Sequence, residues 1–179
     1  SCALAIHTPL GIVVHTGDIK VDFTPVDGNV IDLQRLAKIG KQGVLLLMAD
    51  STNACHPGYT MSEKTVGETL DNLFSKGTGR IIVATFASNI HRLQQIINSS
   101  IKYGRKIAFS GRSMEKISEV AIKLGYLDMP EGLLIDLKDL KLYNSNQITI
   151  VTTGSQGEPM SALTRMACSN HKNIQIEKD

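Results

Sequence analysis

The fold is decided by residues 80–109, RIIVATFASNIHRLQQIINSSIKYGRKIAF. An apolar run of strand length, 81–86, is followed by a helical stretch, 89–103, whose apolar residues recur every three or four positions. A second short apolar run, 106–109, comes next. Strand, helix and strand in this order predict two parallel strands joined by a crossover helix. This stretch therefore predicts a sheet with helices packed against it.

The same alternation extends from this stretch toward both ends of the chain. Further helices are expected at 31–40, 62–75, 114–124 and 159–168, and further strands at 44–49, 147–152 and 173–176. The run 44–49 is continuously apolar, as expected for a strand covered on both faces. Residues 4–8 and 11–16 flank a turn and predict a β-hairpin, whereas 133–142 is ambiguous. The predicted fold class is α/β, a mostly parallel sheet with helices on both faces, preceded by a hairpin.

Composition excludes several classes of protein. With 179 residues, 42% hydrophobic and 20% charged, the chain can bury a core and is not disordered. A net charge of +2 excludes a histone-like nucleic-acid binder, and 4% aromatic residues disfavour a broad base-stacking platform. Three cysteines without CxxC spacing indicate reduced thiols, so we expect a cytoplasmic protein. No run of about 18 apolar residues predicts a membrane span.

Polar segments follow four of the expected strands, and they are 50–54 (DSTNA), 87–92 (ASNIHR), 110–113 (SGRS) and 153–158 (TGSQGE). Parallel strands share one carboxyl edge, where such sheets bind ligands, so we expect the four segments along a common rim. Helix N-termini there carry partial positive charge, and Arg112 adds a guanidinium. Phosphate is therefore the expected ligand. Neither GxxxxGK[ST] nor GxGxxG is present.

These residues also have plainer interpretations. Several are ordinary helix caps or turn formers: Ser88, Asn89, Ser113, Gly154 and Gly157. His91, in the first turn of a helix at this edge, is either a phosphate donor or a simple helix residue. Asp18, beside Gly17 after a strand, is either a metal ligand or a turn residue. His171 is expected at the surface.

Five segments together carry a family resemblance, and they are 15–20 (HTGDIK), 49–54 (ADSTNA), 86–92 (FASNIHR), 110–114 (SGRSM) and 153–160 (TGSQGEPM). In this order they resemble ribonuclease J, of the β-CASP group of metallo-β-lactamase-fold nucleases, over essentially the whole chain. The resemblance implies that residues 1–24 end the first metallo-β-lactamase segment. It implies that residues 25–179 form an incomplete β-CASP domain. Both ends accordingly look cut from a longer protein.

The resemblance also implies an activity for the longer protein. We expect a metal-dependent hydrolase of RNA, with 5′-exonuclease and endonuclease action in RNA processing and decay, including rRNA. The expected cofactors are two divalent metals, zinc or manganese. The expected partner is RNA with a 5′-monophosphate, and the full-length protein is expected to be a homo-oligomer without membrane association.

Individual residues inherit roles from the matching motifs. Asp18 matches a carboxylate of the metal site and Asp50 the acidic residue of motif A, so both are candidate catalytic residues. The candidate substrate-binding residues, with His91 added from its place at the edge, are Ser88, Asn89, His91, Arg112, Ser155, Gln156 and Gly157.

One departure limits what this chain can do alone. The family's HxHxDH motif, which supplies most metal ligands, is absent from it. A single Asp cannot build a two-metal site, so we expect this fragment to bind no catalytic metal and to be inactive. Two alternatives stay open: a stand-alone α/β phosphate- or nucleotide-binding module without catalysis, and a structural or dimerising piece whose polar loops only cap helices.

Overall fold

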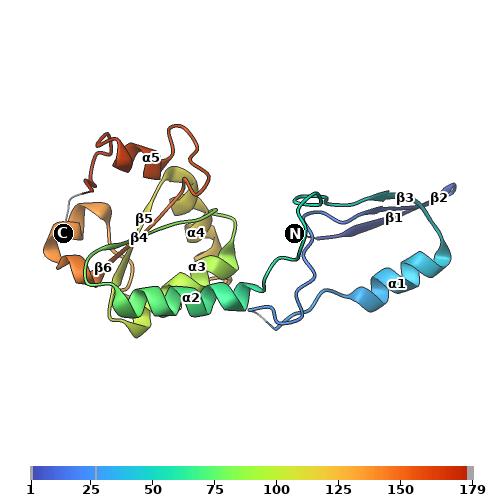
Figure 1. The fold of residues 1–179 in the computed structure, drawn as a ribbon, viewed down its shortest axis with the longest axis horizontal. Helices are drawn as coiled ribbons and strands as arrows, with labels where there is room; N and C mark the ends of the chain where they lie inside the picture. Colours follow the sequence, from blue (N-terminus) through green and yellow to red (C-terminus); the bar gives the residue numbers. More distant parts are fainter. Residues whose placement is uncertain (1, 27, 177–179) are drawn as a thin grey trace. The chain divides into compact units, whose positions relative to one another are not determined.

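The computed structural model describes residues 2–26 and 28–176 (Figure 1). The chain divides into two units, Ser1–Lys64 and Thr65–Asp179. Each unit contains its own three-stranded sheet. Among the described residues, no helix combines the length and the apolar character that crossing a membrane requires.

The second unit is built on a parallel sheet in the order β4-β6-β5, whose strands are β4 (Ile81–Ala84), β5 (Lys106–Ser110) and β6 (Ile148–Thr152). The register pairs both Ala84 and Ser110 with Thr152. All three strands therefore end at the same edge of the sheet.

Helices cover both faces of this sheet, and they are α2 (Glu63–Lys76), α3 (Ile90–Lys102), α4 (Arg112–Lys123), α5 (Ala162–Ala167) and the 3₁₀ helices η1 (Leu137–Leu142) and η2 (Ser145–Gln147). Side chains of β5 alternate between two cores. Ile107 and Phe109 pack with residues of α2, α3 and α4, whereas Ala108 packs with residues of η1 and α5. The predicted α/β class with helices on both faces is confirmed.

Three stretches of the C-terminal third differ from or complete the expectations. The ambiguous stretch 133–142 contains η1, and the helix expected at 159–168 is confined to Ala162–Ala167. The strand expected at 173–176 is wrong, because these residues pair with no strand. Ile174 is only 1% exposed and packs beside Ile148 and Ile150 in the second core, so its apolar character reflects burial rather than strand pairing.

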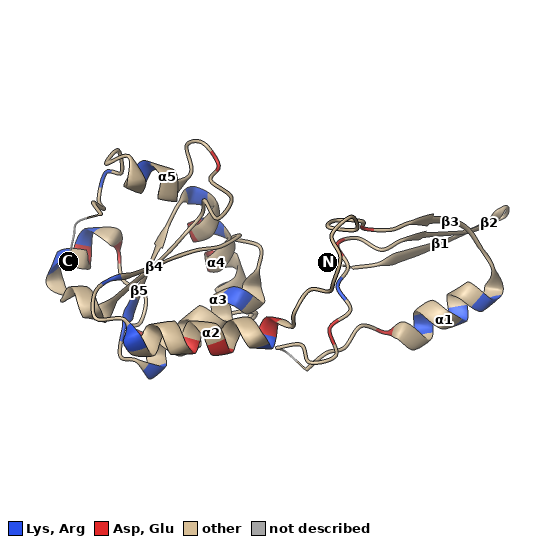
Figure 2. Ribbon diagram, viewed as in Figure 1, with Lys and Arg blue, Asp and Glu red and all other residues tan. Residues whose placement is uncertain are grey.

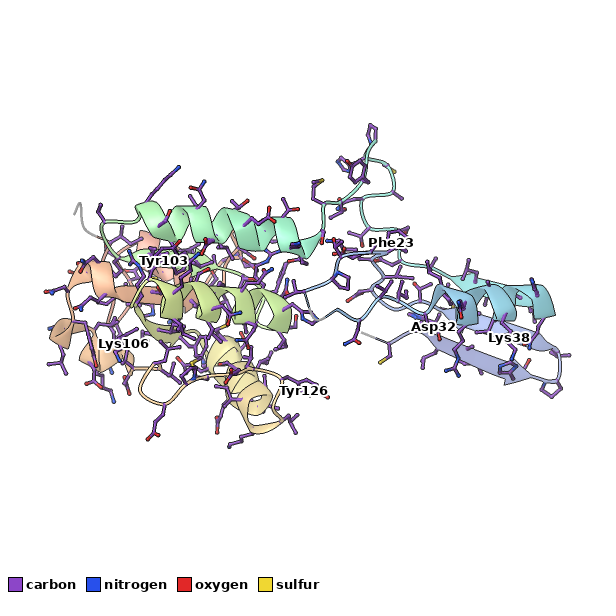
Figure 3. All side chains as sticks on the ribbon, turned by 90° about the horizontal axis from the view of Figure 1, so that it is seen from below. Phe23, Asp32, Lys38, Tyr103, Lys106 and Tyr126 are labelled. Carbon is purple, nitrogen blue, oxygen red and sulfur yellow. The ribbon has the colours of Figure 1, made fainter. Side chains whose placement is uncertain are left out.

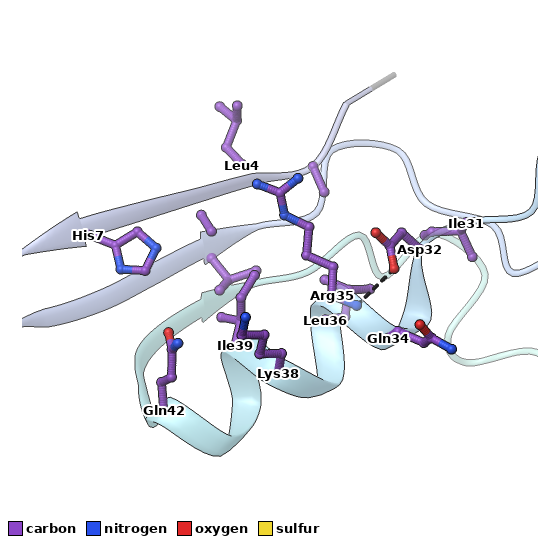
Figure 4. Close-up of a pocket in the computed structure, with 13 residues that line it drawn as sticks. Leu4, His7, Ile31, Asp32, Gln34, Arg35, Leu36, Lys38, Ile39 and Gln42 are labelled. Carbon is purple, nitrogen blue, oxygen red and sulfur yellow. Dashed lines mark hydrogen bonds between the residues drawn. The ribbon is translucent and has the colours of Figure 1, made fainter.

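The first unit contains the predicted hairpin. Its strands are β1 (Leu4–Thr8) and β2 (Gly11–His15), which pair antiparallel, and β3 (Val44–Met48), which pairs parallel with β2. Helix α1 (Leu33–Gln42) connects β2 to β3 in sequence. The Asp32 carboxylate caps it by accepting from the Arg35 amide at 2.8 Å (Figure 4). Basic residues recur along α1, blue in Figure 2.

The expectation that 44–49 is covered on both faces is wrong, although the strand itself is confirmed. Leu45 is 63% exposed and Leu47 is 61% exposed. Among the described strands, β3 pairs only with β2. No residue of α1 is buried, and a groove of ≈ 1000 Å³ opens between α1 and the hairpin (Figure 4). An apolar run favours a strand, but burial needs a covering layer that this unit does not supply.

Candidate functional site

Three of the expected polar segments meet at the carboxyl edge of the second unit's sheet. The Thr85 amide donates to the Thr152 carbonyl at 3.0 Å and continues the parallel pairing beyond β4. A Cβ atom on Gly111 would lie 2.9 Å from the Thr153 hydroxyl, so the loops after β5 and β6 are in close contact. Gly111 also has a φ of 111°, which favours glycine. The structure thus brings the Arg112 loop and the Ser155 loop together.

Helix α4 begins at this contact without a side-chain cap. Gly111 occupies the N-cap position and has no side chain to accept from the first-turn amides. Arg112 and Ser113 follow and are both exposed. The partial positive charge of the helix end and the Arg112 guanidinium therefore lie together at the edge of the sheet.

The loop after β6 is closed by hydrogen bonds from its own backbone amides. The Gly157 amide donates to the Gly154 carbonyl at 3.1 Å and closes a turn. The Gln156 amide donates to a carboxylate oxygen of Glu158 at 3.1 Å, so this turn already holds an anionic oxygen. Ser155, Gln156 and Gly157 are all exposed, as a binding role requires.

Asn89 has a defined structural role in the segment after β4. Its side-chain oxygen accepts from the Arg92 amide at 3.1 Å and caps α3. The side-chain nitrogen takes no part in that bond, so capping and ligand binding are compatible. Ser88 and His91 are exposed beside it.

Sequence reasoning missed His171 at this edge. The residue is half-buried rather than on the surface, and its Nε2 lies 3.1 Å from the hydroxyl of buried Ser110, the last residue of β5. Its Nδ1 accepts from the Asn173 amide at 3.3 Å, so Nε2 carries the proton and donates to Ser110. Burial, with a smaller effect of Arg165, lowers the pKa of His171. Its position after the last helix gave no periodic signal that could have revealed this contact.

The other two predicted motifs meet in the first unit. The Thr16 amide donates to the Met48 carbonyl, and the Asp50 amide donates to the Thr16 hydroxyl, both at 3.0 Å. The Ile19 amide, next to Asp18, donates to Asp50 Oδ2 at 3.4 Å. The loops that carry Asp18 and Asp50 therefore lie side by side where β2 and β3 end.

Asp50 is held as a carboxylate. Its Oδ1 accepts from the amide of Thr52 at 2.9 Å and from the Thr52 hydroxyl at 2.7 Å. These two bonds, and to a lesser degree that from Ile19, lower the pKa of Asp50 against an opposing effect of desolvation. Asp50 is therefore ionised at neutral pH.

The expected common rim of four segments is wrong in one respect. The segment 50–54 follows β3, and β3 pairs with β2 in the first unit rather than with β4, β5 or β6. The strand order cannot be read from an apolar run, because the run does not specify its neighbour. The candidate residues therefore form two groups, Asp18 with Asp50 in the first unit and the remainder in the second.

The donors present do not complete a metal centre. Within residues 2–26 and 28–176, no three His, Cys, Asp or Glu side chains gather closely enough to hold a metal ion. Asp18 and Asp50 offer two carboxylates, and Asp50 already accepts three hydrogen bonds. The described residues alone therefore do not fit a two-metal site.

Fold and site together define a class of protein: a parallel α/β domain with exposed polar loops at the carboxyl edge of its sheet, joined to a small strand unit that carries paired acidic loops. Comparison with known proteins makes the class specific. The family model described as ribonuclease J, beta-CASP domain, matches residues 78–179, more than half of the chain.

Curated relatives agree with this match. The chain is 52% identical to ribonuclease J of Helicobacter pylori (strain ATCC 700392 / 26695) over 177 residues, 99% of the chain and 26% of that protein. It is 48% identical to ribonuclease J of Synechocystis sp. over 99% of the chain and 28% of that protein. It is also 48% identical to ribonuclease J of Thermus thermophilus, over 97% of the chain and 30% of that protein. This chain belongs to the ribonuclease J family and spans between a quarter and a third of the length of these relatives.

Proposed function

We propose that the full-length protein is a metal-dependent ribonuclease with 5′-exonuclease and endonuclease action, and that the second unit binds the 5′-monophosphate end of RNA. The names of the relatives support a nuclease acting on RNA. As the family resemblance implies, the full-length protein acts as a homo-oligomer in the cytoplasm, in RNA processing and decay.

One observation carries the phosphate assignment. The N-terminus of α4 has no side-chain cap, lies against the Thr153 loop and begins with Arg112. First-turn amides that lack an acceptor, a partial positive charge and a guanidinium are the groups that bind a terminal phosphate. A terminal monophosphate carries more charge than an internal phosphodiester, so this edge favours the 5′ end of the strand.

The first unit contributes the acidic residues. Asp18 is proposed as a ligand of the metal site, and Asp50 as a positioning carboxylate, held ionised by Thr52 and Ile19. Bound divalent metals would supply Lewis-acid activation of a phosphodiester. The remaining ligands belong to parts of the full-length protein outside this chain. We therefore propose that residues 1–179 alone cleave no RNA.

The test compares two substrates of one RNA sequence, with a 5′-monophosphate and with a 5′-hydroxyl. In the full-length protein, Arg112→Gln should lower exonucleolytic kcat/KM by about 10- to 100-fold on the monophosphate, because a charge-assisted hydrogen bond contributes about 1.5–3 kcal/mol. The 5′-hydroxyl substrate should change less than twofold. Lys116→Gln, on the same helix and with the same charge change, is the matched control.

Asn89 allows a sharper variant. Asn89→Asp retains the oxygen that caps α3 but adds a negative charge, so it should weaken use of the monophosphate without unfolding the helix. Asn89→Ala removes the cap as well and should lower stability by about 1 kcal/mol. An equal loss on both substrates for Arg112→Gln and Asn89→Asp would remove the 5′-end assignment.

A further inference from the structure

A second polar groove lies at the other edge of the second unit's sheet. It has a volume of ≈ 640 Å³ and is lined by Arg80, which directly precedes β4, and by Ile148, the first residue of β6. Because the strands are parallel, this amino edge is opposite the carboxyl edge that carries Arg112 and Ser155. The groove is therefore separate from the candidate 5′-phosphate site.

Among residues 2–26 and 28–176, four cationic side chains and no acidic side chain line the groove. The cations are Arg80, Lys138, Lys141 and Lys172. Within the described part of the chain, no carboxylate forms an ion pair with any of them. Arg80 donates from Nη2 to the Gln175 carbonyl at 3.2 Å, an acceptor that carries no net charge.

The surroundings of the groove carry charge of both signs, since Arg105 and Lys106 lie near it and η1 contains Asp139 and is preceded by Asp136. The buried guanidinium of Arg105 donates to the carbonyls of Gly79 and Ile148, at 2.9 and 3.2 Å, and to that of Gly77. Lys106, labelled in Figure 3, donates to the Gly132 carbonyl at 2.7 Å. The nearby Asp136 carboxylate is used as a cap, accepting from the Lys138 amide.

The neutral lining suits a nucleotide. Tyr143 offers an aromatic ring, and Ser145 and Asn173 offer hydrogen-bonding groups. The volume lies within the range of sites for small ligands. A concave surface whose charged lining residues are cations concentrates anions, and a ring beside such cations can stack a base while they hold its phosphate.

We propose that this groove is a second phosphate-binding site, which takes a nucleotide unit through its phosphate and base. The nucleotide unit belongs either to an RNA strand that runs along the amino edge or to a free mononucleotide. Both sources share the same chemistry, and the experiment distinguishes them.

The decisive variant in the full-length protein is Lys138→Gln with Lys172→Gln, which removes two exposed cations of the groove. Lys116→Gln with Lys123→Gln, on α4, is the control with the same change of net charge. The probes are adenosine 5′-monophosphate and a single-stranded 5′-hydroxyl RNA, both measured in chelator so that no cleavage occurs.

Equilibrium dialysis counts the mononucleotide sites. The groove variant should lose one site or bind it about tenfold more weakly, while the control should not. Arg112→Gln should leave this site intact, so failure of the 5′-end assignment would not remove it. For the RNA, loss of two phosphate contacts should reduce the slope of log K against log salt by about 1.4.

The outcomes separate cleanly. A reduced RNA slope identifies a strand as the ligand, and weaker mononucleotide binding with an unchanged slope identifies a free nucleotide. The proposal is overturned if two results hold together. The mononucleotide affinities of the groove variant and the control agree within twofold, and the slope of log K against log salt for the RNA is the same in both variants.

Discussion

The two sheets differ in burial, and the strand with the more apolar composition, β3, is the more exposed one. Every residue of β6 is buried, although Thr149 and Thr152 are polar. Every residue of β3 is exposed, although all five are apolar. β6 lies between β4 and β5 with helices on both faces, whereas β3 has one strand neighbour among the described residues. In this chain, which spans only 26–30% of the length of the relatives named above, the burial of each strand follows the layers that the described residues place over it.

The largest predicted effect is a difference between equal truncations in the two sheets. Ile150→Ala, in fully buried β6, should cost about 2–5 kcal/mol, because it leaves a cavity in a close-packed core. Leu47→Ala, in β3, should cost about 0.5 kcal/mol or less, as for other exposed positions. Native-state hydrogen exchange in the full-length protein measures the opening free energy of each unit separately. A large cost at Leu47 would show that another part of that protein covers β3.

The next effect concerns the charge buried in the second unit. Arg105 is 3% exposed and its guanidinium satisfies three carbonyls, over the ring of Phe74. Arg105→Met keeps much of the side-chain volume but leaves these carbonyls without a donor. We expect a loss of about 3 kcal/mol in the free energy of unfolding. Arg165→Met, at an exposed position of α5, is the control and should change stability little. Equal effects would mean that Arg105 contributes only through packing.

A smaller, pH-dependent effect on local stability is expected in residues 171–175 of the second unit. Because the pKa of His171 is lowered in the folded state, the unfolded state binds the extra proton at a higher pH than the folded state does. Stability of this segment should therefore fall as the pH drops below about 6.5, the ordinary value for histidine. Protonation at Nδ1 also removes the acceptor for the Asn173 amide.

The measurement is amide exchange of residues 172–176 at pH 5.5 and 7.5. His171→Gln retains a donor toward Ser110 but does not titrate, so it should flatten the pH dependence. Persistence of the full pH dependence in that variant would assign it to another group.

The smallest expected effect is on the protection of the Glu63 amide, which donates to Asp22 in the first unit. The Asp22 carboxylate accepts from the Thr24 amide at 2.9 Å, from the Ser62 hydroxyl at 2.9 Å and from the Glu63 amide at 3.2 Å. The Thr24 bond is the main cause of its lowered pKa. The ionised Asp22 carboxylate thus stabilises the folded state above pH 3.8, the ordinary pKa of the group. This stabilisation is lost as the pH falls through the lower pKa of the folded state.

We expect a lower protection factor of the Glu63 amide in acid than at neutral pH. Asp22→Asn should show the lower protection at neutral pH already, and Asp139→Asn, on η1, should not. Unchanged exchange in Asp22→Asn would show that Ser62 alone holds the start of α2.

Local patterns predicted the elements well and their partners poorly. The 3.6-residue period of 89–103 and the apolar run 81–86 predicted α3 and β4 to within two residues, because both signals are local. The assignment of 50–54 to the same edge as Arg112 failed, because pairing of β3 with β2 is a long-range choice. His171 was missed for the same reason: its contact with Ser110 joins residues 61 positions apart.

Periodicity and ordered motifs are properties of the chain, so they were enough to predict the helices, most strands, the α/β class and the ribonuclease J family. Which strands share a sheet and which polar residues meet at its edges became known from the folded chain. The same holds for the four cations that line one groove with no carboxylate among the described lining residues. These arrangements depend on contacts between residues far apart in the chain, whose energies no local pattern encodes.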